Sequence, residues 1–256
     1  MTERPLVLLS NDDGYASRGI TALRAALSEY AEVIVAAPES EQSASSHALS
    51  LHRPMRLRTV EAGVFALDGT PADCIYVALH AGGRVVPRRP DLVVSGINHG
   101  MNLGQDVFYS GTVAAAREAA LRRIPAVATS AFHGLDLAAV AKASARIAID
   151  LWKRGPAASG RTPLLNLNFP KGWNGTIRAT RLGSRIYEEA VDFRKDPRGR
   201  EYLWLGGPGV RHESNPGSDT DAYDEGVASI TPLMLDLTST EDADVARALA
   251  AAIGAE

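Results

Sequence analysis

The first forty residues alternate between strand and helix patterns, and this alternation restricts the possible folds more than any other feature. An apolar run at residues 6–9 is followed by a segment, residues 17–29, in which apolar residues recur at the spacings of an amphipathic helix. A second apolar run covers residues 33–37. Strand, helix and strand over so short a length predict a βαβ crossover, and such crossovers build parallel sheets covered by helices. The chain is therefore predicted to begin as a Rossmann-like α/β fold.

The same alternation continues to about residue 168. Strand patterns occur at residues 64–67, 91–96, 126–129 and 164–168, and helix patterns at residues 70–80, 112–123 and 136–154. Thr70 as N-cap, Pro71 at the first helical position and Asp73 in the first turn mark one helix start. We predict a three-layer, doubly wound, mostly parallel sheet.

The composition changes beyond Pro170. Residues 172–227 are rich in Gly, Pro, charged and aromatic residues, with short strand patterns at 177–180 and 202–205. A last strand is predicted at residues 228–231 and an amphipathic helix from about residue 240 to Ile253. The predicted organisation is a metal- and phosphate-binding core at 1–171, a β-rich extension or oligomerisation arm at 172–227, and a final strand and helix at 228–256.

The overall composition excludes several classes of protein. The chain is 45% hydrophobic and 22% charged, with a formal net charge of -3, so bulk charge favours neither a nucleic acid polymer nor an anionic membrane. Cys74 is the only cysteine and is expected to be a buried packing residue, so no intrachain disulfide can form and a reducing compartment is favoured. No stretch approaches the ~20 apolar residues of a membrane span, and the N-terminal apolar run is too short for a signal peptide. We expect a soluble, cytoplasmic protein.

The segment Ser10-Asn11-Asp12-Asp13-Gly14 directly follows the first predicted strand and places two carboxylates side by side. At the carboxyl end of a strand, both side chains can point into the crevice in which open α/β sheets bind ligands. Such carboxylates repel each other unless one takes up a proton or a divalent cation binds them. The segment also has good turn chemistry, so these five residues alone fit a metal site and a solvated turn equally well.

Two loops at the same predicted sheet edge supply neutral oxygen donors. Ser43 lies in the polar segment 38–50 after the second strand, and Asn98 lies in a segment, 97–104, that is rich in glycine and asparagine. Two carboxylates with a hydroxyl and a carboxamide oxygen suit a hard cation such as Mg²⁺ or Mn²⁺.

Several histidines and one basic cluster are further candidate functional groups. Zinc prefers His or Cys ligands, but His47, His52 and His99 lack the paired spacing of zinc sites. His47 and His99 remain candidate proton donors because they lie in or next to the loops. The basic cluster at residues 194–200 fits contact with an anionic substrate, although such a run is more often a solvated loop.

Ser110, Gly111 and Thr112 open the alanine-rich helix. Backbone N–H groups at a helix N-terminus, the helix dipole and two hydroxyls can together bind a phosphate. Ser or Thr also caps many helices that bind no ligand, which is the commoner role for an isolated cap. Because this cap follows the loop at the predicted metal-binding edge, phosphate binding is the preferred interpretation.

Six segments spread over nearly the whole chain match a known pattern. They are SNDDG, APESEQSAS, LDGTPADC, VVSGINHGMNLGQDVFYSGTVAAA, RKDPRGREYLWLGG and TDAYDEGVASITPL. With these segments the chain resembles the survival protein E (SurE) family of 5'-nucleotidases. The resemblance implies a phosphatase that acts on nucleoside monophosphates with one divalent cation, Mg²⁺ or Mn²⁺, per subunit. It also implies a homodimer or homotetramer in which the β-rich arm or the C-terminal helix is exchanged between subunits.

The resemblance also implies roles for individual residues. The implied cation ligands are Asp12, Asp13, Ser43 and Asn98, and the implied phosphate-binding residues are Asn102, Ser110, Gly111 and Thr112. Asp12 and Asp13 are also the expected catalytic residues. Gln42 stands where the family often has a basic residue, so no phosphate contact is assigned to it.

Two catalytic mechanisms and one non-catalytic function fit these residues. The leading hypothesis is metal-assisted hydrolysis of nucleoside 5'-monophosphates, in which one aspartate is a candidate acceptor for the proton of the attacking water. Nucleoside 3'-monophosphates and short polyphosphate are further candidate substrates. A second mechanism is attack on phosphorus by Asp12, but haloacid dehalogenase-type phosphatases, which use this chemistry, carry an Asp where this chain has Gly14. The third is a non-catalytic nucleotide or phosphate sensor.

Overall fold

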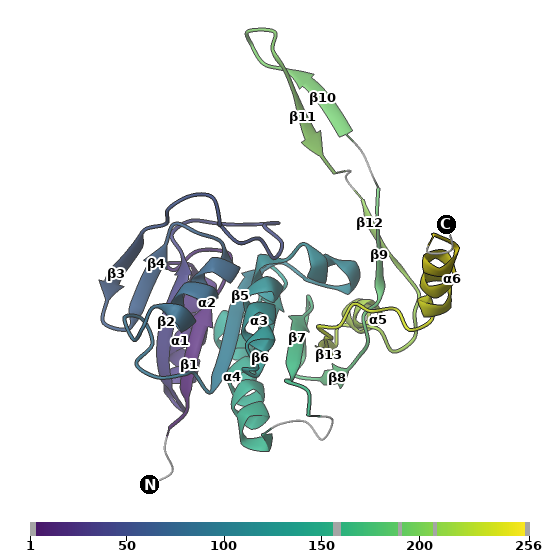
Figure 1. Cartoon of the computed structure of the whole chain (residues 1–256). Helices are drawn as coiled ribbons and strands as arrows, with labels where there is room; N and C mark the ends of the chain where they lie inside the picture. The colour runs from purple at the N-terminus through teal and green to yellow at the C-terminus, as the bar shows by residue number, and fades with distance from the viewer. Residues whose placement is uncertain (1–3, 156–159, 189–190, 207–208, 254–256) are drawn as a thin grey trace.

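The computed structural model of the chain describes residues 4–155, 160–188, 191–206 and 209–253. Its centre is a nine-stranded sheet with the order β3-β4-β2-β1-β5-β6-β7-β13-β8 (Figure 1). The strands are β1 (Leu6–Ser10), β2 (Glu32–Pro38), β3 (Leu57–Glu61), β4 (Val64–Leu67), β5 (Leu92–His99), β6 (Ala126–Ala131), β7 (Leu164–Phe169), β8 (Ile177–Ala179) and β13 (Ala228–Pro232). The six strands from β4 to β7 in this order pair in parallel, which confirms the predicted doubly wound α/β fold.

Burial on both faces explains why the central strands are continuous apolar runs. Every residue of β1 is buried. Val7 and Leu9 belong to the hydrophobic core on one face of the sheet, and Leu6 and Leu8 belong to the core on the other. A parallel strand covered on both sides needs apolar residues at every position, so its sequence lacks the alternation of a half-exposed strand.

Helices cover both faces of the sheet and complete the three layers. The helices are α1 (Arg18–Ser28) and α4 (Leu137–Arg154) on one face, and α2 (Pro71–His80) and α3 (Gly111–Leu121) on the other. Helix α1 lies directly against the backbone of β5. The approach is so close that a Cβ at Gly19 would lie 2.0 Å from the carbonyl oxygen of Ile97. Glycine at this position therefore allows a close helix–sheet contact.

Capping side chains place helix starts close to where the sequence predicts them. Thr70 and Asp73 form a reciprocal capping box, in which the Asp73 N–H donates to Thr70 Oγ1 at 3.1 Å and the Thr70 N–H donates to Asp73 Oδ2 at 2.9 Å. That helix ends at His80, as predicted, and its Cys74 is buried. Ser110 caps α3, which begins one residue before the predicted start.

Two strands from the C-terminal half extend the central sheet. Strand β13 pairs antiparallel with β7 and parallel with β8, so both strands continue the core sheet. The exposed edge strand β3, which pairs antiparallel with β4, was not predicted from the sequence. The division of the chain after residues 171 and 227 stays a prediction.

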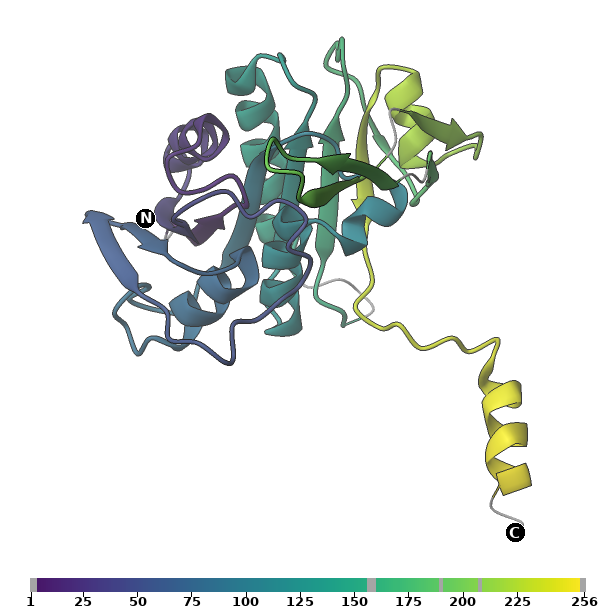
Figure 2. The same cartoon turned by 90° about the horizontal axis from the view of Figure 1, so that it is seen from above.

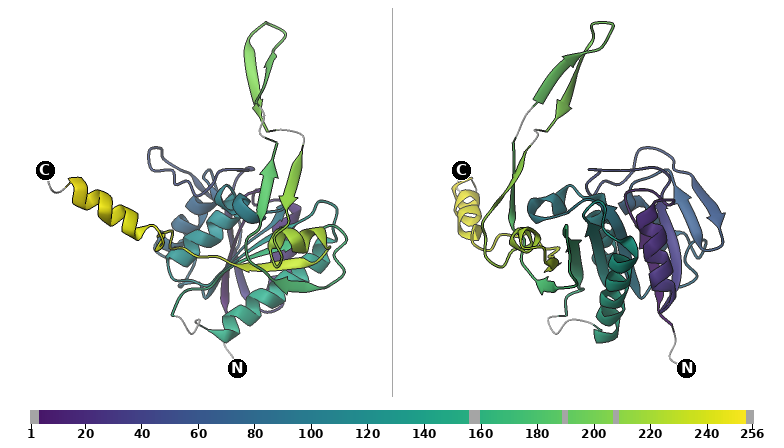
Figure 3. Two further views of the ribbon diagram at one scale, coloured as in Figure 1. Left: turned by 90° about the vertical axis from the view of Figure 1, so that its right-hand side faces the viewer. Right: turned by 180° about the vertical axis from the view of Figure 1, so that it is seen from behind.

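A two-stranded arm projects from the core, as Figures 1 and 3 show. Near the core, β9 (Ser184–Tyr187) pairs with β12 (Val210–Glu213), and farther out β10 (Val191–Lys195) pairs with β11 (Glu201–Leu205), all antiparallel. We call the described residues between 184 and 213 the arm.

Helix α6 (Ala243–Ile253) follows β13 at the end of the described chain and stands away from the sheet (Figure 2). None of its residues is buried. The short helix α5 (Asp219–Asp224) contacts β13, β12 and β7 instead. Across the described ranges, each helix is too short or too polar to cross a lipid bilayer.

Candidate active site

The candidate site lies where the strand order of the sheet reverses. From β1 the sheet extends through β2 on one side and through β5 on the other, and the crevice at the carboxyl ends of two such strands is where doubly wound sheets bind ligands. Ser10, the last residue of β1, is the register partner of Ser95 in β5. Asp12 and Asp13 therefore leave β1 beside the end of β5, which carries Asn98.

Asp12 is a buried carboxylate, with 5% of its surface exposed. Its Oδ1 accepts a short hydrogen bond from Thr112 Oγ1. Burial raises the pKa of Asp12 to about 6 against the opposing effect of the Thr112 hydroxyl, and the charge of Asp13 adds to the rise. In the described chain no basic side chain contributes to this pKa. The ionised carboxylate therefore lacks the counter-charge that a cation would supply.

Asp13 is only partly buried and lies closer to solvent. Its Oδ2 accepts the backbone N–H of His99 at 3.2 Å. Burial raises the pKa of Asp13, the His99 N–H lowers it, and the nearby charge of Glu41 raises it. No cluster of three or more Asp, Glu, His or Cys in the described ranges is arranged to hold a metal ion. A cation at this pair would thus need other ligands, such as hydroxyl or amide oxygens, water or substrate.

The loop after β2 lies against the acidic pair through its backbone. The Gln42 N–H donates to the carbonyl oxygen of Asp12 at 2.8 Å, which holds this loop beside β1. Ser43 follows directly, but its side chain is exposed and its hydroxyl donates to Glu41 Oε1 at 2.6 Å. The structure therefore brings the Ser43 loop to the site, with the Ser43 hydroxyl bonded to a neighbouring carboxylate.

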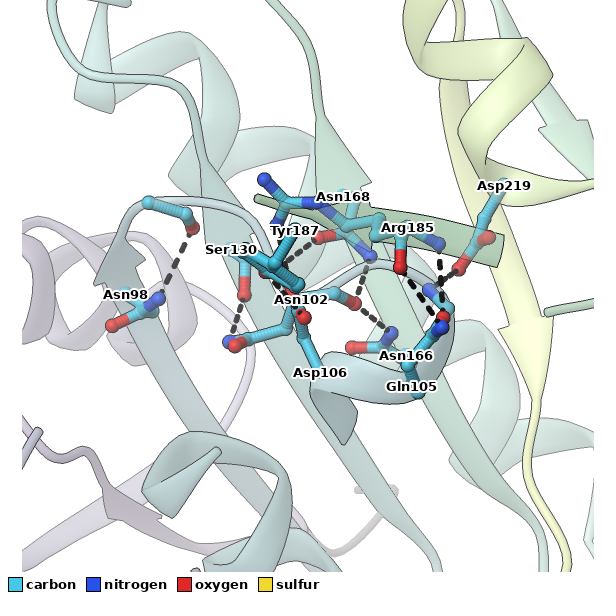
Figure 4. A network of polar contacts seen from close by, with 12 residues as sticks. Asn98, Asn102, Gln105, Asp106, Ser130, Asn166, Asn168, Arg185, Tyr187 and Asp219 are labelled. Atoms are coloured by element: carbon cyan, nitrogen blue, oxygen red, sulfur yellow. Dashed lines mark hydrogen bonds and ion pairs between the residues drawn. The ribbon is translucent and has the colours of Figure 1, made fainter. Parts of the chain in front are cut away.

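Asn98 lies near the end of β5, partly exposed. Its Nδ2 donates to the carbonyl oxygen of Gly100 at 3.1 Å (Figure 4). This bond orients the side chain and leaves the amide oxygen without a protein hydrogen bond among the described residues. A carboxamide oxygen held in this way is a suitable ligand for a hard cation.

The N-terminus of α3 contacts Asp12 directly. Ser110 caps this helix by accepting the Val113 N–H at 3.0 Å, a bond that does not use the proton of the Ser110 hydroxyl. A Cβ at Gly111 would lie 2.9 Å from the Cβ of Asp12, so a larger residue would displace one of the two. Because Thr112 also bonds to Asp12, an anion at this helix terminus would lie next to a cation at the carboxylate.

Asn102 is buried on the loop between β5 and α3 and is held by several hydrogen bonds (Figure 4). Its N–H donates to Asn168 Oδ1 at 2.9 Å, its carbonyl oxygen accepts from Asn166 Nδ2 at 2.8 Å and Asn168 Nδ2 at 3.0 Å, and its Nδ2 donates to Ser130 Oγ at 2.8 Å. The three supporting residues were not predicted to have a role. Two asparagines at positions i and i+2 of a buried strand share one face, and this is the signal that could have revealed them.

The side chains of the other sequence candidates form no hydrogen bond to the acidic pair within the described residues. His47 Nε2 bonds to Glu118 Oε2 on α3 at 2.9 Å. His99 is exposed and packs against His133, with ring centroids 4.4 Å apart. The basic cluster at residues 194–200 lies at the outer end of the arm, beyond the core of its own chain (Figure 1).

Comparison with known proteins relates this arrangement to one family. Residues 7–189 match the family described as Survival protein SurE. The 5'-nucleotidase SurE of Sorangium cellulosum is 60% identical over 97% of this chain and 96% of its own length, and that of Anaeromyxobacter dehalogenans is 50% identical over 91% of each. The crystal structure of the SurE protein from Aquifex aeolicus matches with a TM-score of 0.80 and 37% identity, covering 96% of this chain and 99% of that one. The chain therefore belongs to the SurE family.

Proposed function

We propose that this chain is a divalent-cation-dependent 5'-nucleotidase that hydrolyses nucleoside 5'-monophosphates to nucleoside and phosphate. The contact between Asp12 and the start of α3 carries this proposal, because it joins a candidate cation site to a candidate phosphate site. The names of the relatives, 5'-nucleotidase SurE at 60% and 50% identity over most of the chain, support the same activity.

The proposed ligands of one Mg²⁺ or Mn²⁺ per subunit are Asp12, Asp13, Ser43 and Asn98. Their chemistry fits such an ion, because all four offer oxygen atoms and Asp12 is a buried acid with no basic partner in the described chain. Ser43 would exchange its bond to Glu41 for the cation. When bound, the cation would polarise a phosphoryl oxygen and orient the attacking water.

The start of α3 and Asn102 are the proposed phosphate-binding groups. The Ser110 hydroxyl proton and the Gly111 N–H can donate to phosphate oxygens, and the helix dipole favours the anion. Asn102 has a second amide proton beyond the one it donates to Ser130, and Asn168 helps to hold its backbone in place. Donors fixed in this way can stabilise charge that develops on the phosphoryl oxygens.

Asp12 and Asp13 are the proposed catalytic residues. The Asp12 carboxylate accepts the Thr112 hydroxyl and backbone N–H groups of Asp12 and Thr112, and the Asp13 carboxylate accepts the His99 N–H. The remaining lone pairs of each carboxylate can hold the cation or accept the proton of the attacking water. An amide cannot accept this proton and lacks the charge that strengthens cation binding, so an asparagine at either position should remove most of the activity.

The activity is tested by phosphate release from AMP and GMP with Mn²⁺, in wild-type protein and in the Asp13→Asn variant. Release that a chelator and the substitution both abolish would support the proposal. Nucleotide binding without phosphate release would identify a sensor instead, and a trapped phosphoenzyme would identify attack by Asp12. A panel with 3'-monophosphates and short polyphosphate then defines the substrate range.

We also propose that the protein acts as a homo-oligomer, a dimer or tetramer, held together by the arm and α6. The outer arm exposes large apolar side chains, with 61% of both Phe193 and Trp204 accessible. Helix α6 exposes Val245, Leu249 and Ile253, and it projects from the core (Figures 2 and 3). Exposed apolar surface on projecting elements is typical of a protein–protein interface.

A further inference from the structure

Two of the proposed phosphate-binding residues, Asn102 and Ser110, lie at either end of one short loop. Between them is a single 3₁₀ turn, η1 (Gly104–Phe108). The backbone N–H of Ser110 donates to the carbonyl oxygen of Asp106 at 3.0 Å, so the position of η1 sets the position of the α3 cap. What holds η1 in place therefore also affects the phosphate-binding groups.

Side-chain hydrogen bonds connect η1 to the base of the arm. Gln105 and Arg185 of β9 exchange two bonds of 2.9 Å, one from Gln105 Nε2 to the Arg185 carbonyl and one from the Arg185 N–H to Gln105 Oε1. The Asp106 carboxylate accepts the Arg185 guanidinium and, at 2.6 Å, the hydroxyl of Tyr187 (Figure 4). Asp106 is buried, so this carboxylate depends on both arm residues to offset its desolvation.

A second carboxylate, that of Asp219, joins the same loop to the start of the arm. Asp219 of α5 is fully buried, and it accepts the Gly104 N–H at 3.0 Å and the Gly183 N–H at 2.7 Å. The two glycines also touch, since a Cβ at Gly104 would lie 2.7 Å from the Gly183 carbonyl oxygen. The loop after Asn102 and the strand that begins the arm are thus held as one unit.

We propose that Asp106 and Asp219 are positioning residues that fix the phosphate-binding loop to the base of the arm, so that the arm determines phosphate affinity separately from cation affinity. This inference rests on the proposed function. Asp12 and Asp13 are placed by β1, and Thr112, which bonds to Asp12, lies within α3. The Ser110 N–H is instead bonded to Asp106 of η1, so a displaced η1 should change phosphate affinity more than cation affinity.

The test measures inorganic phosphate binding and Mn²⁺ binding by calorimetry in the full-length protein, without turnover, and then kcat and KM for AMP. Asp106→Asn should weaken phosphate binding by about 10-fold, the effect of losing one hydrogen bond to a charged group, and raise KM more than it lowers kcat. Tyr187→Phe removes a single hydroxyl from a partly exposed side chain and should weaken phosphate binding in the same direction with the fold intact. Mn²⁺ affinity should stay within about twofold in both variants.

A combined variant and a matched control make the test specific. If Asp106 acts through Tyr187, the double variant should lose less phosphate affinity than the two single losses together. Arg24→Ala removes a partly exposed α1 residue that pairs with Glu61, outside the site and the arm, and it should leave both affinities unchanged. Asp219→Asn should reproduce the phosphate defect from the other side of the loop.

Three results would overturn the proposal. If folded Asp106→Asn and Tyr187→Phe bind phosphate as tightly as the unmodified protein does, the arm does not position the loop. The proposed function would still stand in that case, provided that the unmodified protein is active. Equal losses of phosphate and Mn²⁺ affinity would show a merely structural role. A wild-type protein that neither binds phosphate nor releases it from AMP would refute both the positioning role and the proposed function.

Discussion

Replacing Asp12 by asparagine should stabilise the cation-free protein at neutral pH and remove the stabilising effect of a cation. The substitution keeps an oxygen that can accept the Thr112 hydroxyl, and it removes the charge. Asp12 is 5% exposed, and burial raises its pKa from the ordinary 3.8 to about 6. The ionised carboxylate therefore destabilises the folded state.

The size and sign of this effect follow from linkage. A rise from 3.8 to about 6 corresponds to about 3 kcal/mol at 1.36 kcal/mol per pH unit. Between these two values the folded protein binds the Asp12 proton more tightly than the unfolded chain, so stability falls as the pH rises through this window. The gain from Asp12→Asn should be close to zero below about pH 4 and reach about 3 kcal/mol at about pH 8.

The assay is reversible unfolding in urea, with a chelator, across this pH range, followed by the same measurement with Mn²⁺. Mn²⁺ at ~100 times its dissociation constant should stabilise wild type by ~2.7 kcal/mol and the variant far less. Asp150→Asn, which removes an exposed carboxylate on α4, is the control for the loss of one charge. A variant no more stable than wild type at about pH 8 would refute the role of burial. Equal stabilisation by Mn²⁺ would refute the role of Asp12 as a ligand.

Four further predictions concern the site and the interface. Asp13→Asn should lower kcat/KM for AMP by at least ~100-fold with the circular dichroism spectrum unchanged; retained activity would exclude Asp13 from the reaction. Gly111→Ala should cost about 1–3 kcal/mol of stability and weaken Mn²⁺ binding, because its Cβ would crowd Asp12; normal affinity would contradict this packing. Thr112→Val should raise the pKa of Asp12 further, so the acid limb of the pH–activity profile should move to higher pH, and an unmoved limb would argue against the bond. Leu249→Arg should reduce the mass measured by light scattering, whereas an unchanged mass would place the interface elsewhere.

The core of the fold could be predicted because its determinants are local. Helix periodicity, strand length and capping residues such as Thr70 and Asp73 lie within a few positions of the structure they specify. The buried strands are recognisable as continuous apolar runs, since a strand buried on both faces needs an apolar residue at nearly every position. The order of the parallel strands then places the residues after β1 and β5 at one edge.

The rest of the fold depends on contacts that local patterns do not record. The inner arm strands are short and largely exposed, so their sequences carry little apolar alternation. Strand β3 is an exposed edge with no buried face. The loop at Asn102 is held by Asn166 and Asn168, more than sixty residues away in the chain. Its η1 turn is held by Arg185 of the arm, 80 residues from Gln105.

The candidate site combines both kinds of information. That Asp12 and Asp13 would lie beside the end of β5, which carries Asn98, follows from strand order, because neighbouring parallel strands end at the same edge. That Asp12 would contact the start of α3 does not follow from strand order, since a helix can begin at many distances from a neighbouring loop. The contact is possible because residue 111 is a glycine, so the helix terminus and the carboxylate approach without a side chain between them. The middle residue of the Ser-Gly-Thr cap is therefore informative, because the glycine lets the proposed phosphate-binding helix terminus lie directly against the proposed cation ligand Asp12.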